Sequence, residues 1–246
     1  MQISEQGRRE NNEDSFYDAV IKVDGKDVAI GCVCDGMGGL SNGKQASQCI
    51  REAVRDFVLK SGNIDGLDEE LSRVSNEIYT NAQVQNMQSG TTCTVICCMD
   101  RAWKIYHIGD SRCFMYDVQK NQAYQLTTDH TALNAYAKKL EEMENADPQT
   151  DPLAEEKHRR AHLIRKNYKN KLTRCLGVQE NPQMDVLTGS YRVGDRFLLC
   201  SDGFWHYLSP SDFNAGTIED LGGLVEKFLA KGEGDNMTAV LITITD

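Results

Sequence analysis

The chain contains the run Val28-Ala29-Ile30-Gly31-Cys32-Val33-Cys34, which leads directly into Asp35-Gly36-Met37-Gly38-Gly39. The run is apolar and rich in β-branched residues, so it predicts a strand buried in a sheet. The glycines that follow it predict a turn. Because a carboxylate at the end of a buried strand stays at the rim of its sheet, Asp35 is expected to lie at such a rim.

Three further carboxylates stand at the ends of strand-like runs. Asp110 follows residues 105–109, Asp202 follows residues 197–201, and Asp235 precedes residues 238–244. In antiparallel sheets the end of one strand and the start of the next share a rim, so the four carboxylates are expected to converge. Converging carboxylates repel one another unless a cation lies between them. The pattern therefore predicts a hard metal ion and metal-assisted chemistry.

The rest of the chain predicts further strands and helices. Residues 16–35 predict a hairpin with its turn at Asp24-Gly25. Apolar residues recur at helical spacing over 43–60 and 67–87, which predicts two amphipathic helices. The other expected elements are strands at about 91–99, 103–109, 112–118, 123–127, 184–188, 196–201 and 238–244, and helices at about 210–214 and 218–231. This order predicts an α+β fold, a four-layer α-β-β-α sandwich of two antiparallel sheets packed face to face with helices on the outside.

Residues 131–172 differ from the rest in composition. They are polar and charged, and Pro148 and Pro152 lie among Asp, Glu and Gln. Two helical pieces are expected, at about 131–145 and 153–168. We interpret this block as a flap-like insertion in a single domain that spans residues 1–246.

Composition and charge exclude several classes of protein. The chain has 246 residues, of which 40% are apolar and 26% charged, as in ordinary globular domains. Its net charge of −10 argues against nucleic acid and against an anionic membrane as partners. No apolar run is long enough to span a bilayer, and no secretory signal pattern is found. The nine cysteines include no CxxC pair and lie mostly in apolar runs, which favours a reducing, cytoplasmic location.

The order and spacing of the short motifs resemble those of the metal-dependent protein phosphatase family (PPM, type 2C). The resemblance covers the whole chain and is carried by residues 9–14, 35–39, 90–92, 109–112, 126–130, 173–177, 200–203 with Trp205, and 235–238. It implies a bacterial-type serine/threonine protein phosphatase that uses two or three Mg²⁺ or Mn²⁺ ions. Position by position, it implies metal ligation by Glu13, Asp14, Asp35, Gly36, Asp110, Asp202 and Asp235, and catalytic roles for Arg9, Asp14 and Asp35.

The implied chemistry is direct attack of a metal-activated water on phosphorus, without a covalent intermediate. The resemblance also implies that Asp35 bridges two metal ions, that the Gly36 carbonyl is a backbone ligand, and that Asp110 and Asp202 together bind a third metal ion. Arg9 suits the binding of the phosphate because a guanidinium fork matches two phosphate oxygens. Animal-type members have a His as general acid where this chain has Met37, so the general acid is unassigned. His130 is expected to have a packing and hydrogen-bonding role.

Other catalytic patterns are weaker. The Cys-x5-Arg spacing of Cys49 and Arg55 matches cysteine-dependent phosphatases, but it lies in an amphipathic helix without glycine, so core packing is favoured. His158 and His162 lie among arginines, which repel a cation. Ser111 and Ser201 lack a triad pattern. Phe204 and Trp205 are expected in the core.

The sequence therefore predicts hydrolysis of phosphoserine and phosphothreonine on proteins, opposing a Ser/Thr kinase, by a cytoplasmic monomer that acts in signalling. Two alternatives stay open. One is a pseudophosphatase that binds phosphoproteins without turnover, and the other is a phosphatase of a small phosphorylated metabolite. Loss of an acid would favour the first, and fast turnover of a metabolite would favour the second.

Overall fold

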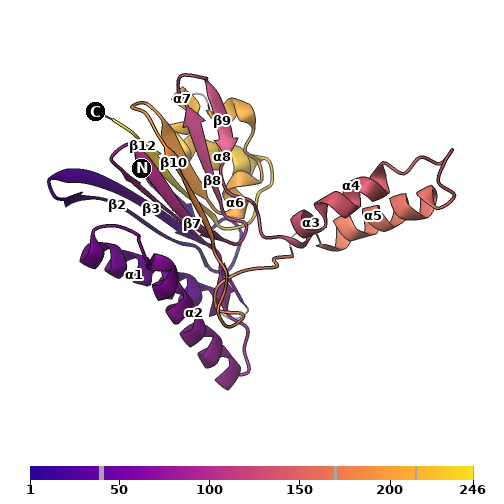
Figure 1. The fold of residues 1–246 in the computed structure, drawn as a ribbon, viewed down its shortest axis with the longest axis horizontal. Helices are drawn as coiled ribbons and strands as arrows, with labels where there is room; N and C mark the ends of the chain where they lie inside the picture. The colour runs from indigo at the N-terminus through magenta and orange to yellow at the C-terminus, as the bar shows by residue number, and fades with distance from the viewer. Residues whose placement is uncertain (39–41, 169–170, 214, 246) are drawn as a thin grey trace.

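Two five-stranded antiparallel sheets form the centre of the computed structural model, which describes residues 1–38, 42–168, 171–213 and 215–245 (Figure 1). The first sheet has the order β10-β7-β6-β3-β2 and the second has the order β1-β12-β11-β8-β9. The first contains β2 (Ser15–Val23), β3 (Lys26–Cys34), β6 (Cys93–Met99), β7 (Ala102–Ile108) and β10 (Asp185–Ser190). The second contains β1 (Gln2–Glu5), β8 (Arg112–Asp117), β9 (Gln122–Gln125), β11 (Arg196–Cys200) and β12 (Met237–Thr243). A short pair, β4 (Gly36–Met37) and β5 (Gly90–Thr91), lies beside them.

Helices cover the outer face of each sheet. On the first sheet these are α1 (Asn42–Ser61) and α2 (Leu67–Val84). On the second they are α6 (Asp202–Trp205), the 3-10 helix η1 (Pro210–Phe213), α7 (Ala215–Ile218) and α8 (Leu221–Ala230). None of the described helices is both long and apolar enough to cross a membrane.

Three apolar cores lie between the four layers. Ile50 and Val54 of α1 pack against β3 and β6 in the first. Ile96 and Phe197 belong to the second, which fills the space between the two sheets. Phe228 of α8 packs against β11 and β12 in the third. This alternation of layers confirms the predicted α+β, four-layer α-β-β-α sandwich.

Most of the predicted elements are present, with corrections at their ends. The expected hairpin at 16–35 and the helix at 43–60 are confirmed as β2–β3 and α1. The single helix expected over 131–145 is wrong, because it breaks at Tyr136 into two pieces. The helix expected from residue 218 begins only at Leu221, where the Asp220 side chain caps it by accepting a hydrogen bond from the Gly223 N–H at 2.9 Å. Residue 214 of the helix expected at 210–214 lies outside the described residues.

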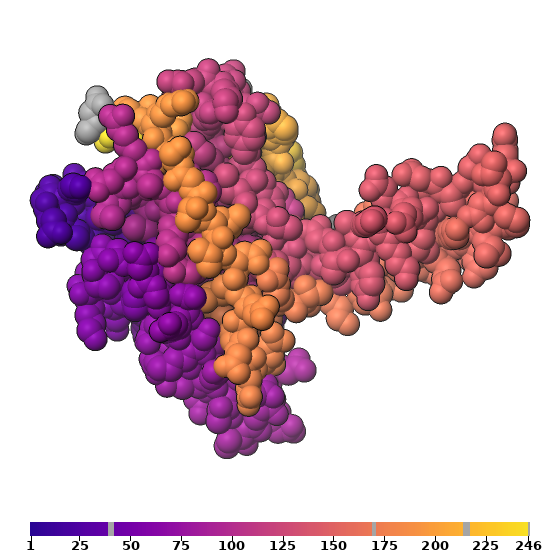
Figure 2. Space-filling model, in the orientation of Figure 1, coloured from indigo at the N-terminus to yellow at the C-terminus, as the bar shows by residue number. Residues whose placement is uncertain are grey.

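The segment after β9 stands away from the sandwich as an arm (Figures 1 and 2). The arm consists of α3 (Ala132–Ala135), α4 (Ala137–Glu144) and α5 (Ala154–Tyr168). At its base Thr131 pairs with Leu172, and the Thr173 N–H donates to the His130 carbonyl at 2.8 Å. Among the described residues of the arm, Leu140 is the one large apolar side chain that is buried, and the others, such as Ala161, are small. The interpretation of residues 131–172 as an insertion in one domain stays a prediction.

Candidate active site

The strand ends that carry the predicted carboxylates meet at one rim of the sandwich. In the first sheet the start of β2 pairs with the end of β3 through Ser15 and Cys34, and the end of β7 reaches the start of β6. In the second sheet the end of β11 lies beside the start of β12 and the start of β8. The antiparallel registers therefore bring Asp14, Asp35, Asp110, Asp202 and Asp235 to the same end of the two sheets.

Asp35 is held by hydrogen bonds of its main chain, which do not engage its carboxylate. Its N–H donates to Thr92 Oγ1 at 2.9 Å, and its carbonyl accepts from the Thr92 N–H and Thr91 Oγ1, each at 2.9 Å. Gly36 follows in a crowded place, where a Cβ would come within 2.2 Å of the Gly43 carbonyl oxygen and 2.6 Å of the Glu13 carbonyl oxygen. Only glycine allows this approach of three main-chain segments, which brings the Gly36 backbone beside Glu13.

Asp14 is buried at the centre of the site, with 2% of its surface exposed. Ser201 Oγ donates to Asp14 Oδ2 at 2.8 Å, and Lys44 Nζ donates to the Asp14 carbonyl at 2.5 Å. Asp14 Oδ1 has no hydrogen-bond partner within the described part of the chain. Burial raises the pKa of Asp14 to about 7, although the hydrogen bond from Ser201 opposes the shift. A buried carboxylate oxygen without a partner is costly and is a natural place for a cation.

Asp202 and Asp235 face each other across the start of α6. A Cβ at Gly203 would come within 2.3 Å of the Asn236 carbonyl oxygen and 3.0 Å of Asp235 Cβ, so the two loops touch through this glycine. Burial raises the pKa of Asp202, and the charge of Asp235 adds to this effect. Arg9 Nη2 donates to Asp235 Oδ2 at 2.7 Å, while 61% of the Arg9 side chain is exposed. Most of the guanidinium donors therefore stay available to a ligand.

Asp110 lies on a turn between β7 and β8. Gly109 adopts a φ of +109°, and its N–H donates to His130 Nδ1 at 3.1 Å, so the neutral ring donates from Nε2 to Asp185 Oδ2 at 3.0 Å. Trp205 Nε1 donates to the Asp110 carbonyl at 2.9 Å. Burial and then the charge of Asp202 raise the pKa of Asp110 to about 7. The hydrogen-bonding role expected for His130 fits these contacts.

The carboxylates raise one another's pKa values because they are close together and repel one another. This is the behaviour expected of carboxylates that bind a cation when the cation is absent. The pKa of Asp35 lies well above its ordinary value because of burial and then the charges of Asp14, Asp202 and Asp110. Burial also raises the pKa of Glu13. The ligands offered are carboxylate and carbonyl oxygens, which hard divalent ions prefer. The partnerless Asp14 Oδ1 and this oxygen-only donor set fit Mg²⁺ or Mn²⁺.

Without metal, this repulsion is expected to make stability depend on pH. The pKa values of Asp14 and Asp110 rise from an ordinary 3.8 to about 7, so the folded protein binds these protons more tightly than the unfolded chain. The stability that they contribute is fully present below about pH 4 and is lost as the pH rises through about 7. In EDTA, we therefore expect these groups to lower the melting temperature between about pH 5 and about pH 7.5.

Thermal melts followed by circular dichroism, with and without Mn²⁺, would measure this effect. Mn²⁺ should raise the melting temperature most at the higher pH, and Asp14→Asn should weaken the pH dependence in EDTA. A metal-free melting temperature that stays constant or rises from about pH 5 to about pH 7.5 would contradict the account.

Several positioning residues were not predicted from the sequence. Asn236 Oδ1 accepts from the Glu13 N–H at 2.8 Å, and its Nδ2 donates to the Gln6 and Asn11 carbonyls at 2.8 and 3.0 Å. It thereby ties the N-terminal segment to the Asp235 loop. The adjacency of Asn236 to Asp235 was a signal for this role, whereas nothing local to Lys44 indicated its contact with Asp14.

Two other predictions are settled by geometry. Cys49 lies on α1 and packs against the first core, as the interpretation of the Cys-x5-Arg spacing required. Phe204 is fully buried, as expected, whereas Trp205 is half-buried, packing against the third core on one side and lining a cleft on the other. Arg112 stacks on its ring, with the guanidinium carbon 3.3 Å from the ring centroid. Gly39 of the predicted glycine-rich turn lies outside the described residues.

A cleft of about 540 Å³ runs from this site to the arm. Asp110, Asp202 and Trp205 line its inner end, and Glu144 and Arg165 of the arm line its outer end. Its remaining lining residues are Arg112, Asp129, Thr131, Leu133, Asn134, Ala137, Leu140, Glu141 and His206. The cleft thus joins the carboxylates to α3 and α4 in one continuous depression.

Comparison with known proteins agrees with this fold and site. A family model described as protein phosphatase 2C matches residues 3–241. The serine/threonine phosphatase stp of Listeria welshimeri is 27% identical over 226 residues, covering 85% of this chain and 82% of its own. The serine/threonine protein phosphatase PstP of Mycobacterium tuberculosis is 27% identical over 258 residues, covering 97% of this chain but 43% of its own length.

Solved structures show the same fold. The catalytic domain of PstP in complex with two manganese ions superposes with a TM-score of 0.76 at 25% identity, covering 100% of this chain and 97% of that one. The serine/threonine phosphatase of S. agalactiae superposes with a TM-score of 0.77 at 24% identity, covering 99% and 98%.

The fold and the carboxylate rim define a metal-dependent type of phosphatase. The family match extends over nearly the whole chain, so the chain belongs to the protein phosphatase 2C family. This confirms the resemblance found in the sequence and the prediction of an enzyme that is a protein phosphatase. The bacterial relatives agree with the predicted bacterial type.

Proposed function

We propose that this enzyme hydrolyses phosphoserine and phosphothreonine on proteins with the help of divalent cations. The observation that carries the proposal is the cluster of mutually repelling carboxylates with the partnerless Asp14 Oδ1 at its centre. The serine/threonine specificity by which the Listeria and mycobacterial relatives are named supports the substrate class. The manganese ions named for the PstP catalytic domain support the choice of cofactor.

The proposed metal ligands are Glu13, Asp14, Asp35, the Gly36 carbonyl, Asp110, Asp202 and Asp235. They would hold two or three Mg²⁺ or Mn²⁺ ions, with Asp110 and Asp202 holding the third. Bound divalent cations would lower the pKa of a water molecule and offset charge on the phosphoryl oxygens. The main-chain hydrogen bonds to Asp35 and the Ser201–Asp14 contact keep the ligands in place before a substrate arrives.

Arg9 is the proposed phosphate-binding residue. Its side chain is largely exposed, and within the described part of the chain its one ion pair is with Asp235. The remaining N–H groups can donate to two phosphoryl oxygens and stabilise the charge that spreads over them in the transition state. Met37 lies on β4 and cannot protonate the leaving alcohol, so the proton must come from another group.

The cleft beside the carboxylates is the proposed binding site for the substrate chain. Two of its acids are neutralised by arginines, because Arg112 pairs with Asp129 at 2.7 Å and Arg165 pairs with Glu144 at 2.8 Å. Glu141 is exposed and has no cationic partner among the described residues. If Asp110 and Asp202 bind metal ions, Glu141 remains the uncompensated negative charge of the cleft. This charge favours substrates with basic residues near the phosphorylated residue.

This preference is expected to depend on Glu141. Wild-type enzyme should have a higher kcat/KM for a phosphothreonine peptide flanked by arginines than for one flanked by glutamates. Glu141→Lys should reduce this ratio of kcat/KM values by a few-fold. An exposed charge interaction is worth about 0.2–1 kcal/mol, and the substitution changes one such interaction with each of the two peptides. Glu142→Lys is the matched control, because it makes the same charge change one residue away and outside the cleft lining. Equal effects of the two variants would contradict the assignment.

We also propose a cytoplasmic monomer that opposes a Ser/Thr kinase in signalling. Phosphate release from phosphothreonine, phosphoserine and phosphotyrosine peptides and from small phosphate esters tests the function. We expect Mn²⁺-dependent phosphate release that is fastest from phosphothreonine or phosphoserine peptides. Fast turnover restricted to a small ester, or no turnover by folded, metal-loaded protein, would reject it.

A further inference from the structure

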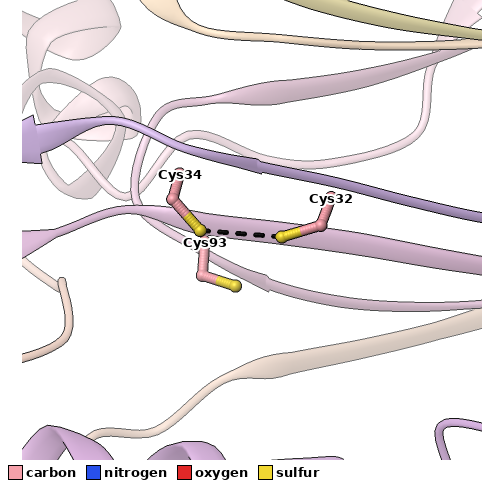
Figure 3. A group of neighbouring side chains, drawn as sticks. All are labelled: Cys32, Cys34 and Cys93. Carbon is pink, nitrogen blue, oxygen red and sulfur yellow. Dashed lines mark hydrogen bonds between the residues drawn. The ribbon is translucent and has the colours of Figure 1, made fainter. Parts of the chain in front are cut away.

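Three cysteine thiols form a closed cluster beside the carboxylate site (Figure 3). Cys32 and Cys34 are two residues apart on β3 and so point to the same face of the sheet. Cys93 begins the neighbouring strand β6, and the register that pairs Val33 with Thr94 sets it opposite Cys34. All three side chains are fully buried, and their Sγ atoms all lie within 4.8 Å of one another.

The spacing of these sulfurs fits one metal ion at their centre. Metal–thiolate bonds are about 2.3 Å long, so three sulfurs around an ion in one plane are about 4 Å apart. The Sγ atoms of Cys32 and Cys34 are 3.6 Å apart, and the largest separation in the cluster is at most 4.8 Å. Shifts of less than about 1 Å therefore produce a three-coordinate site.

The surroundings select the kind of ion. The three cysteines belong to the apolar core between the first sheet and the helices α1 and α2. Within the described ranges no other His, Cys, Asp or Glu joins the cluster as a fourth ligand, which disfavours the closed tetrahedral site of structural zinc. Sulfur-only ligation in an apolar pocket favours a soft monovalent ion over the hard ions that the carboxylates prefer.

We propose that Cys32, Cys34 and Cys93 bind one copper(I) ion at a site separate from the carboxylates. Binding displaces protons from the thiols that become thiolate ligands. Because the cluster is closed to solvent, the ion enters during folding or when the paired ends of β3 and β6 open locally, so uptake by the folded protein is slow.

The copper site is coupled to the catalytic rim through two short links. Cys34 is bonded directly to Asp35, and Cys93 follows Thr92, whose Oγ1 accepts from the Asp35 N–H at 2.9 Å. Drawing the sulfurs together moves the two strand ends that position Asp35. Copper(I) is therefore expected to lower the Mn²⁺-dependent phosphatase rate. This consequence rests on the proposed function, whereas the binding of copper(I) is independent of it.

Anaerobic transfer of copper(I) from a coloured chelator tests the proposal. The chain is refolded in the chelate solution in a Cys49→Ala background, because Cys49 is the one half-buried thiol of the nine. Loss of chelate colour should report one copper(I) per chain. Cys32→Ala and Cys93→Ala should each lower the affinity at least about tenfold, which is about 1.4 kcal/mol.

Cys97→Ala is the matched control, since Cys97 is buried on the same face of β6 but lies outside the cluster. It should bind like its parent, and circular dichroism should show every variant folded. No transfer on refolding, or equal losses in Cys93→Ala and Cys97→Ala, would overturn the site. One bound copper(I) per chain with an unchanged phosphatase rate would overturn the coupling to the catalytic rim but not the copper site. The measured number of bound copper ions does not depend on any phosphatase activity.

Discussion

Asp35→Asn is expected to abolish phosphatase activity while leaving the fold intact. The asparagine keeps the shape of the side chain. The Asp35 N–H donates to Thr92 Oγ1 and the Asp35 carbonyl accepts from Thr91 Oγ1, and both bonds engage only the main chain of Asp35. The lost charge removes a central ligand of the proposed cations, whose stabilisation of the transition state is worth several kcal/mol. A fall in kcat/KM of about 10³-fold or more is expected.

The metal-free stability of this variant should not fall with its activity. In the absence of metal Asp35 is repelled by Asp14, Asp202 and Asp110, so its neutral replacement should leave the metal-free melting temperature unchanged or raise it. Asp27→Asn, at the opposite end of β3, is the control and should retain activity. Wild-type turnover by Asp35→Asn in saturating Mn²⁺ would refute the ligand assignment.

Arg9→Ala is expected to lower kcat/KM for a phosphothreonine peptide by about 10²-fold or more. Hydrogen bonds from a charged donor are worth about 1.5–3 kcal/mol each, and the guanidinium can offer two to a phosphoryl group. Arg9→Lys should recover part of the loss, because it restores the charge but not the fork. The measurement is steady-state kinetics with kcat and KM determined separately.

Arg8→Ala provides the matched control for Arg9. Arg8 is the neighbouring exposed arginine, and its one main-chain hydrogen bond, from its N–H to the Gly234 carbonyl at 2.9 Å, survives the substitution. It should keep nearly full activity. Equal losses in the two variants would show that the segment needs positive charge in general rather than a phosphate contact from Arg9.

The sandwich could be predicted because its elements carry strong local patterns. The strand ending at Asp35 and the amphipathic helix α1 were both evident from apolar periodicity, and short links fixed the antiparallel pairing. The short strands β1 and β4 were missed, because runs of four and two residues carry no measurable period. The break of a predicted helix at Tyr136, where φ is −102° and ψ is 5°, carries no local sequence signal such as Pro or Gly.

Asp35, Asp110, Asp202 and Asp235 could also be located from the sequence, since each adjoins a recognisable strand. Glu13 and Asp14 were indicated only by the family resemblance. The environment of these acids could not be predicted. That Asp14 is the most buried of them, that Lys44 contacts its carbonyl and that Asn236 accepts from the Glu13 N–H all depend on contacts between segments far apart in the chain. The cysteine cluster escaped notice for a similar reason, because Cys93 lies 59 residues from Cys34 and meets it only through sheet register.

The most direct test of the account is a titration of metal-free protein with Mn²⁺ in which bound ions and phosphate release are measured in the same samples. We predict that release from a phosphothreonine peptide appears as at least two ions bind per chain, that EDTA abolishes it, and that Asp202→Ala binds fewer ions and stays inactive. Undiminished phosphate release in EDTA, or full activity of Asp202→Ala, would contradict the claim that this carboxylate rim is a metal-dependent catalytic centre.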